Sequence, residues 1–321
     1  MAVAENTLPA SLSKTAGRPS PLLFVGSLLA IHLVWGSTYL AIRYAVETIP
    51  PLLVAGTRHL VAGSVLYLWM RARGERPTAR EWRSAAVLGT LYFLVSHGGL
   101  HWAEQVVPSG LAAVLIAIEP VFIALLTPVL LGGRLPGGRT WIGFALGVAG
   151  VALLVQGNGS AAQPGYVVGA LVILLSAFSW AVGVVYSRRA ALPRSPVLTS
   201  AMAMISGAVL LWLAGIATGE HRALHLSAVA PRSALSLLYL IVFGSLVAFT
   251  AYNWLLDHVS PTLIATHTYT NPVVAVLLGW WLAGETLSGR ILLSGMLILG
   301  AILLVRRGTA TVPPREAPAG D

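Results

Sequence analysis

The chain contains no cysteine and few charged residues. Asp, Glu, Lys and Arg together make up 10% of its 321 residues, whereas 56% of the residues are hydrophobic. The absence of cysteine excludes disulfide bonds and thiolate metal sites. Because charged residues make up about a quarter of an average soluble domain, the low charge content argues against a soluble protein and favours a membrane protein.

Long apolar stretches recur along the chain. About 20 consecutive, predominantly apolar residues are needed for a membrane-spanning helix. We expect ten such helices, at residues 22–42, 52–70, 84–102, 109–131, 140–156, 166–186, 196–217, 233–256, 261–283 and 289–305. The connections between them are short, so no soluble domain is expected. The polar tails at 1–21 and 306–321 are expected to be disordered.

Positive charge is distributed unevenly around these predicted helices. The net charge is +9, from 20 Lys and Arg residues against 11 Asp and Glu residues. If the N-terminus is cytoplasmic, 15 of the 20 basic residues fall in cytoplasmic segments and four fall outside, as the positive-inside rule requires. The charge therefore predicts a multi-pass protein of the plasma or inner membrane with both termini in the cytoplasm, and not a nucleic-acid-binding protein.

The chain also contains an internal repeat. One set of residues recurs after 145 positions and pairs Trp35, Arg43 and Pro51 with Trp180, Arg188 and Pro196. A second set recurs after 152 positions and pairs Trp102, Pro120, Gly132, Leu135 and Gly143 with Trp254, Pro272, Gly284, Leu287 and Gly295. We infer an all-α membrane protein with two five-helix repeats, at 22–156 and 166–305. Because five is odd, the second repeat is inverted, as in many secondary transporters.

Four motifs resemble those of a known family. They are W-G-S-T-Y at 35–39, P-P-L-L-V-A-G-T-R-H at 50–59, V-P-S-G-L-A-A-V-L at 107–115 and N-P-V-V-A-V-L-L-G-W-W-L-A-G-E at 271–285. In order and spacing they resemble the EamA-type transporters of the drug/metabolite transporter superfamily. The resemblance implies ten helices in two inverted five-helix repeats, and transport of small metabolites without ATP. One departure is that the Gly-Glu turn of the second half, Gly284-Glu285, stands as Gly133-Arg134 in the first half.

A single carboxylate, Glu119, lies well inside a predicted span. A charge at the centre of a membrane helix costs about 2.5–3.5 kcal/mol even on the mildest scale, so Glu119 is a candidate for binding a proton or a cationic substrate. The alternative is a structural Glu, neutral, hydrogen-bonded or paired with Arg58. Pro120 and Pro272 each lack an amide hydrogen and are expected to bend their helices and free a backbone carbonyl.

Polar and aromatic residues in other spans are candidates for the same central site. Trp35 and Trp180 occupy equivalent positions in the two repeats, which suits stacking on an apolar or cationic ligand, although packing is an equal alternative. Tyr269 belongs to a polar face of the ninth span, and Asn271 lies next to that face. Arg58 can contact substrate or extend to the outer surface. We therefore expect a substrate or coupling site that combines Glu119, Trp35, His97, Trp180, Tyr269, Asn271 and Arg58.

His97 is followed by His101 one helical turn later. Such a pair can bind a metal or relay protons, or simply pack. No third metal ligand accompanies the pair in the sequence, so we predict neither a metal site nor a cofactor.

Together these features predict a secondary transporter that moves a small organic metabolite, an amino-acid-like compound or a drug, across the plasma membrane by alternating access. Export is the expected direction and the proton is the candidate coupling ion. A non-transporting membrane scaffold or sensor is the main alternative, and an intramembrane metalloenzyme is a weaker one. The glycine series Gly143, Gly147 and Gly150 serves helix packing within the chain or a homodimer equally well.

Overall fold

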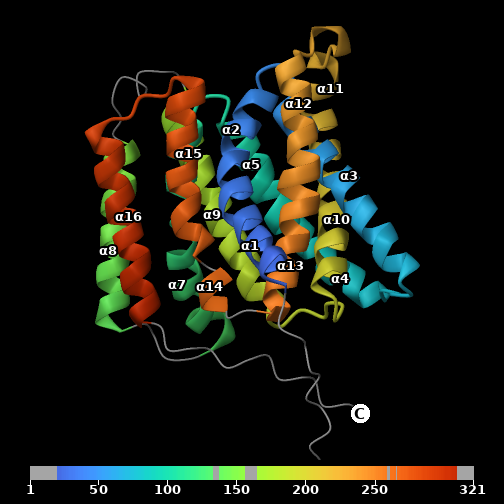
Figure 1. The fold of residues 1–321 in the computed structure, drawn as a ribbon, viewed down its shortest axis with the longest axis horizontal. Helices are drawn as coiled ribbons and strands as arrows, with labels where there is room; N and C mark the ends of the chain where they lie inside the picture. Colours follow the sequence, from blue (N-terminus) through green and yellow to red (C-terminus); the bar gives the residue numbers. More distant parts are fainter. Residues whose placement is uncertain (1–19, 133–136, 156–164, 259–260, 265, 309–321) are drawn as a thin grey trace, which may run out of the picture.

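The computed structural model describes residues 20–132, 137–155, 165–258, 261–264 and 266–308. Within these residues the chain is helical throughout, and the helices lie side by side in one bundle (Figure 1). Residues 1–19 and 309–321 of the predicted tails lie outside the described residues, as do Gly133 and Arg134 of the first-half turn. The remaining tail positions are described, and helix α1 begins at Pro21 while α16 continues to Gly308.

The first half consists of helices joined by short connections. In chain order they are α1 (Pro21–Leu29), η1 (Ala30–Val34), α2 (Trp35–Ala45), α3 (Pro51–Ala72), α4 (Ala79–Leu88), η2 (Gly89–His97), α5 (Gly98–Ala103), α6 (Ser109–Ile116), α7 (Glu119–Leu131) and α8 (Gly138–Val155). Segments η1 and η2 are π-helical and join the α-helices before and after them.

The second half follows the same plan. Its elements are α9 (Tyr166–Ser187), α10 (Pro196–Ala217), α11 (Glu220–Ala223), the 3₁₀ turn η4 (Leu226–Ala228), α12 (Pro231–Tyr239), η5 (Leu240–Val247), α13 (Ala248–His258), α14 (Pro261–Ile264), α15 (His267–Ala283) and α16 (Gly289–Gly308). Segment η5 is π-helical and stands about one repeat length after η2. Both occur where the predicted third and eighth spans were expected to be regular.

Helices lie in each of the ten predicted ranges in the described part of the chain. Six stretches are long and apolar enough to cross a membrane, namely Pro21–Ala45, Pro51–Ala72, Ser109–Leu131, Tyr166–Ser187, Pro196–Ala217 and Pro231–Leu255. Two shorter apolar helices are Gly138–Leu153 and Gly289–Val305. Large apolar side chains on the outside of the bundle, such as Leu213 and Trp281 at 57% and 73% exposure, suit contact with lipid.

The two halves pack against each other along their lengths. Helix α3 packs on α10, and α8 packs on α16. Helix α2 of the first half packs on α15 of the second. In the equivalent contact the halves exchange roles, and α9 of the second half packs on α6 and α7 of the first. The centre of the molecule is therefore an interface between the halves, to which both contribute corresponding helices.

The contact between α8 and α16 uses the glycines of the first half. A β-carbon on Gly143 would lie 2.8 Å from the Ala301 carbonyl oxygen, and one on Gly150 would lie 2.9 Å from the Ile298 side chain. These two glycines thus permit close helix approach inside one chain. A homodimer through the same face stays a prediction.

Candidate functional site

A central cavity of about 670 Å³ lies between the two halves. Its walls include eight of the nine residues singled out from the sequence, namely Trp35, Arg58, His97, Glu119, Pro120, Trp180, Asn271 and Pro272. Tyr269 is not among the lining residues and packs partly buried against the main hydrophobic core. The tertiary fold thus brings together side chains from six predicted spans.

Glu119 is the first residue of α7, after an interruption of the helix. Helix α6 ends at Ile116, α7 starts at Glu119, and Pro120 stands in its first turn. Proline is well tolerated there because the first amide hydrogens of a helix have no intrahelical partner. In the second half, α14 ends at Ile264 and α15 begins at His267, whereas Pro272 lies inside α15.

The carboxylate of Glu119 is half-buried and lines the cavity. Among the described residues it has no hydrogen-bond or ion-pair partner, because the ion pairs in that part of the chain join Arg43 to Glu285 and Arg232 to Glu47. The proposed pairing of Glu119 with Arg58 is therefore not observed. The N-terminal end of α7 favours a negative charge at this position.

Arg58 faces inward and does not extend to the surface. Its side chain is 2% exposed, its Nε donates to Ser245 Oγ at 2.9 Å, and its Nη2 donates to the Gly244 carbonyl at 3.4 Å. Both acceptors belong to the π-helical segment η5. These bonds use two of the five N–H donors of the guanidinium, so Arg58 has further donors for a ligand in the cavity that it lines.

One wall of the cavity is an aromatic cluster around Trp35. Its ring lies 5.4 Å from Phe249, 5.3 Å from Tyr252 and 5.1 Å from His267, measured between ring centroids. The indole Nε1 donates to the Gly244 carbonyl at 3.2 Å, which fixes the ring. Sequence reasoning missed Phe249 and Tyr252 because their single aromatic rings carry no motif.

A second aromatic cluster surrounds Trp180 on the other half. His97 stacks on Trp180 at 5.4 Å with an interplanar angle of 12°, and Tyr92 lies 4.3 Å from the same ring. The offset of 152 residues places Phe249 opposite His97 in the repeat, so the two tryptophans contact equivalent neighbours. The repeat offset was the available signal for Phe249.

Asn271, the counterpart of Glu119, is bonded to the backbone. In the amide orientation that satisfies both of its ends, its nitrogen donates to the carbonyls of His267, Ile31 and His32 at 3.1, 3.3 and 3.0 Å. Ile31 and His32 belong to the π-helical segment η1, whose backbone departs from regular α-helix. Asn271 therefore joins α15 to η1 and is 9% exposed.

The cavity reaches the surface at one end of the molecule. Its lining includes Ser187 at the end of α9 and Arg194, an exposed residue of the following connection. We call this the open end. Tyr166, at the start of the same helix, lines a separate pocket of about 50 Å³ together with Glu285. A helix of 22 residues is about 33 Å long, so Glu285 lies near the opposite end.

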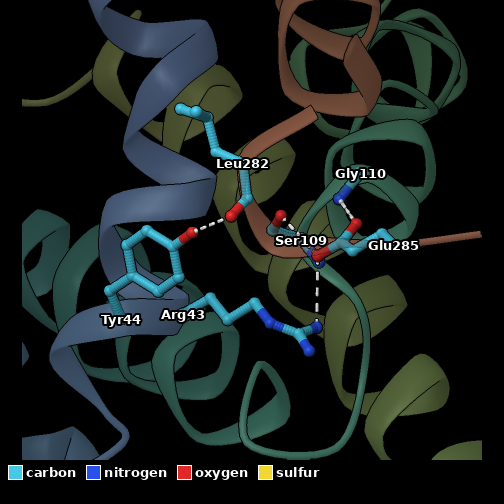
Figure 2. Close-up of polar contacts among 6 residues, drawn as sticks. All are labelled: Arg43, Tyr44, Ser109, Gly110, Leu282 and Glu285. Carbon is cyan, nitrogen blue, oxygen red and sulfur yellow. Dashed lines mark hydrogen bonds and ion pairs between the residues drawn. The ribbon is translucent and has the colours of Figure 1, made fainter. Parts of the chain in front are cut away.

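At that opposite end a polar clamp joins the halves (Figure 2). Glu285 Oε1 accepts from Arg43 Nη1 at 3.1 Å and from the Ser109 amide and hydroxyl at 2.7 Å each, and Oε2 accepts from the Gly110 amide at 3.0 Å. Tyr44 Oη donates to the Leu282 carbonyl at 2.8 Å. The carboxylate thus caps the N-terminus of α6. We call this the clamp end.

The position of Glu285 depends on the residue before it. Gly284 has φ +63 and ends α15 in the left-handed conformation that glycine adopts without steric cost. The family motif pointed to this Gly-Glu pair, but its partners could not be read from the sequence because Arg43 and Ser109 are far away along the chain.

His97 also contacts a histidine that the sequence did not single out. Its Nδ1 lies 2.8 Å from Nε2 of His59, and Nδ1 of His101 lies 2.6 Å from the His97 carbonyl oxygen. Across the described residues no group of three or more His, Asp or Glu side chains is arranged to hold a metal ion.

Known proteins resemble this chain in sequence and in fold. The chain is 40% identical over 301 residues to an Escherichia coli K12 protein named uncharacterized inner membrane transporter YedA, covering 92% of this chain and 94% of the relative. It is 28% identical over 285 residues to the Bacillus subtilis uncharacterized transporter YvbV, covering 87% and 90%. A solved crystal structure of a protein 24% identical in sequence superposes with a TM-score of 0.60, covering 88% and 96%, and shares the fold.

The sequence profile of the EamA-like transporter family matches residues 22–156 and 167–307. The two matched stretches coincide closely with the two repeats inferred from the sequence and cover most of the chain. This protein is a member of the EamA-like transporter family.

Proposed function

We propose that the protein is a secondary transporter that exports a small, amino-acid-like metabolite across the inner membrane by alternating access. The observation that carries this proposal is the cavity between the two halves. It is lined by a guanidinium, two aromatic clusters and a carboxylate that has no partner within the described residues. Its volume falls within the range of about 300–1,000 Å³ that is typical of small-molecule sites.

The charges in the cavity favour a zwitterion. Glu119 provides an acceptor for an ammonium group, and Arg58 provides donors for a carboxylate. The Trp35 and Trp180 clusters provide flat apolar surfaces for the remainder of the substrate. An organic cation is the second candidate, because it would use Glu119 and the aromatic faces alone.

Ten membrane-spanning helices in two inverted repeats would place this cavity near the bilayer midplane. The repeat offsets and the equivalent contacts of α2 with α15 and of α9 with α6 and α7 support that architecture. Arg188, Arg189 and Arg194 lie at the open end, so the positive-inside rule supports a cytoplasmic orientation for it. The conformation is then inward-facing, with substrate loaded from the cytoplasm.

Release on the other side requires the clamp end to open and the open end to close. The clamp holds α2 and α6 of the first half to the end of α15 in the second half. Relative movement of the halves would break these contacts together. The clamp is therefore the proposed outer gate.

The proposal is tested by counterflow of radiolabelled phenylalanine in proteoliposomes, with phenethylamine and phenylpropionate as competitors. These three compounds share one apolar body and differ in their charges. Loss of a charged hydrogen bond is worth about 1.5–3 kcal/mol, so Glu119→Gln should weaken phenylalanine binding roughly 10- to 100-fold. Glu47→Gln, which removes a carboxylate of a surface ion pair, is the matched control and should transport normally.

The competitors separate the two substrate classes. If the substrate is a zwitterion, Arg58→Gln weakens phenylalanine and leaves phenethylamine competition in place. If it is an organic cation, phenethylamine competes best and Arg58→Gln changes little. Unchanged counterflow in folded Glu119→Gln contradicts the proposed site. Absence of saturable flux in the wild type for these compounds and for ethidium favours a scaffold or sensor.

A further inference from the structure

A row of buried ionisable side chains extends from the cavity along the third helical stretch. His97, His101 and Glu104 are spaced i, i+4 and i+7, which places them on one face of a helix. His101 and Glu104 are 0% and 2% exposed, and His59 on α3, which contacts His97, is 0% exposed. Of these four side chains, His97 lines the cavity that contains Glu119, and His59, His101 and Glu104 do not.

This row contains half of the buried side-chain atoms that lack a hydrogen-bond partner in the described part of the chain. In the described part of the chain, eight buried side-chain nitrogen or oxygen atoms lack a hydrogen-bond partner, and four of them belong to this row: His59 Nδ1, His101 Nε2 and both oxygens of Glu104. Each such atom costs about 1–3 kcal/mol when buried. Three of the four atoms lie on one face of the third helical stretch, and the fourth belongs to His59 of α3, which contacts His97. Their concentration at one place indicates a functional cluster.

The observed hydrogen bonds leave free proton acceptors. Nδ1 of His101 must donate to the His97 carbonyl oxygen at 2.6 Å, so a neutral His101 has its lone pair on the unpartnered Nε2. One proton lies between His59 Nε2 and His97 Nδ1 at 2.8 Å. A further proton on this pair would convert it to an imidazole–imidazolium pair, in which the shared hydrogen bond becomes charge-assisted.

The two ends of the row meet the two functional parts of the molecule. His97 lies in the cavity wall against Trp180. Glu104 follows the last residue of α5 and stands five positions before Ser109 of the clamp. The groups near enough to Glu104 to interact with it electrostatically are Glu285, Arg43, Arg58 and Tyr39. Arg58 is also near enough to interact with His59, His97 and His101.

We propose that His97, His59, His101 and Glu104 form a proton pathway that couples proton entry to the state of the clamp. This inference rests on the proposed transport function. When Glu104 is neutral, Arg43 interacts with Glu285 alone and the clamp stays closed. When Glu104 loses its proton, it competes with Glu285 for Arg43 and the clamp weakens. One proton then passes inward through the row for each substrate molecule that passes outward, and no bond other than those to the proton is made or broken.

The first test follows the protons directly and requires no substrate. Infrared difference spectra of the purified protein in lipid nanodiscs, recorded across a pH titration, report buried carboxyl groups by their C=O stretch. We expect Glu104→Gln to remove one band that Glu119→Gln retains, and Glu104→Asp to shift that band. Glu47→Gln, at an exposed ion pair, should leave the buried bands unchanged. Identical spectra for the wild type and folded Glu104→Gln would overturn the proposal.

The second test follows the clamp. The chain has no cysteine, so Ala113→Cys, in the cavity wall one turn from Ser109, creates a single reactive thiol. Because maleimide reacts with the thiolate, whose fraction rises with pH at any cysteine, the rate of labelling by a membrane-impermeant maleimide from the clamp side is divided by the rate from the open end. This ratio should increase several-fold as pH rises. Adding Glu104→Gln should abolish the increase. A ratio that rises equally with pH in both proteins would contradict the link to the clamp.

Phenylalanine flux then separates this inference from the transport proposal. In proteoliposomes with an inside-outside pH difference, Glu104→Gln should lose gradient-driven accumulation and retain exchange of labelled for unlabelled phenylalanine. If even the wild type shows no flux, the transport function fails while the spectra and the labelling still decide the proton pathway. If Glu104→Gln accumulates phenylalanine as the wild type does, the coupling role is wrong although transport stands.

Discussion

The two halves of this protein share a backbone plan and differ in chemistry. At five equivalent positions the first half has an ionisable side chain and the second half a neutral one: Arg58 and Ala203, His59 and Met204, His97 and Phe249, His101 and Asn253, and Glu119 and Asn271. The corresponding helices nevertheless make corresponding contacts. Duplication therefore supplies the architecture, and the chemistry is concentrated in one copy.

The difference is clearest at Glu119 and Asn271. Both line the cavity, but Glu119 has no partner among the described residues, whereas Asn271 donates to three backbone carbonyls. One position leaves a carboxylate available to a ligand, and its counterpart uses an amide to join two helical segments. Equivalent positions in the repeat can thus serve function in one half and stability in the other.

Replacing each member of this pair with leucine should produce the largest contrast. Asn271→Leu removes the side-chain donor that joins α15 to η1 and should lower the unfolding free energy by about 2–4 kcal/mol. Glu119→Leu removes an unpartnered carboxylate and loses only its interaction with the α7 N-terminus, so we expect a change within about 1 kcal/mol. Thermal unfolding in detergent, followed by tryptophan fluorescence, measures both. Equal destabilisation of the two variants would contradict the division of roles.

The clamp provides a second, smaller contrast. Glu285→Gln keeps one acceptor oxygen, which can serve the Ser109 amide or the Gly110 amide but not both, and removes the charge that faces Arg43. We expect labelling of Ala113→Cys from the clamp side to rise roughly 10-fold, as loss of a charge-assisted bond worth about 1.5 kcal/mol implies. Labelling from the open end should be unchanged. An equal rise from both ends would indicate general loosening and not a gate.

The sequence was sufficient to predict a protein made of helices, because apolar length is a local property. A bend was expected at Pro120 and at Pro272. The helix is interrupted between α6 and α7 just before Pro120, whereas Pro272 lies inside α15, so the bend stays a prediction. The π-helical segments η1, η2 and η5 were not predicted, because their hydrophobic composition resembles that of ordinary membrane helices.

The candidate site was only partly predictable. Trp35, His97 and Glu119 were identified from residue type and repeat position, and all three line the cavity. Tyr269 was grouped with them by helical spacing, which cannot tell a cavity from a hydrophobic core. The capping role of Glu285 and the contact of His59 with His97 join distant segments. Such contacts follow from tertiary packing and not from any local pattern.

The smallest contrast concerns His97 and Phe249, which contact Trp180 and Trp35 respectively. His97→Phe makes the first half resemble the second: an aromatic ring is kept against Trp180, and the bond to His59 is lost. Loss of one hydrogen bond between neutral groups is worth about 0.5–1.5 kcal/mol, so the melting temperature should fall slightly.

The fluorescence of Trp180 provides a second measurement, because a protonated imidazole ring beside an indole changes the fluorescence of that indole. The Trp180 contribution, measured as the difference between the wild type and Trp180→Phe, should depend on pH in the wild type. It should not in His97→Phe. In the reciprocal variant Phe249→His, the position equivalent to His59 is occupied by Met204, so the new imidazole lacks the counterpart of that partner. We therefore expect phenylalanine transport by Phe249→His to depend on pH as it does in the wild type. If its pH dependence differs from that of the wild type, the asymmetry between the halves lies in the ring at this position alone, and not in the row of groups behind His97.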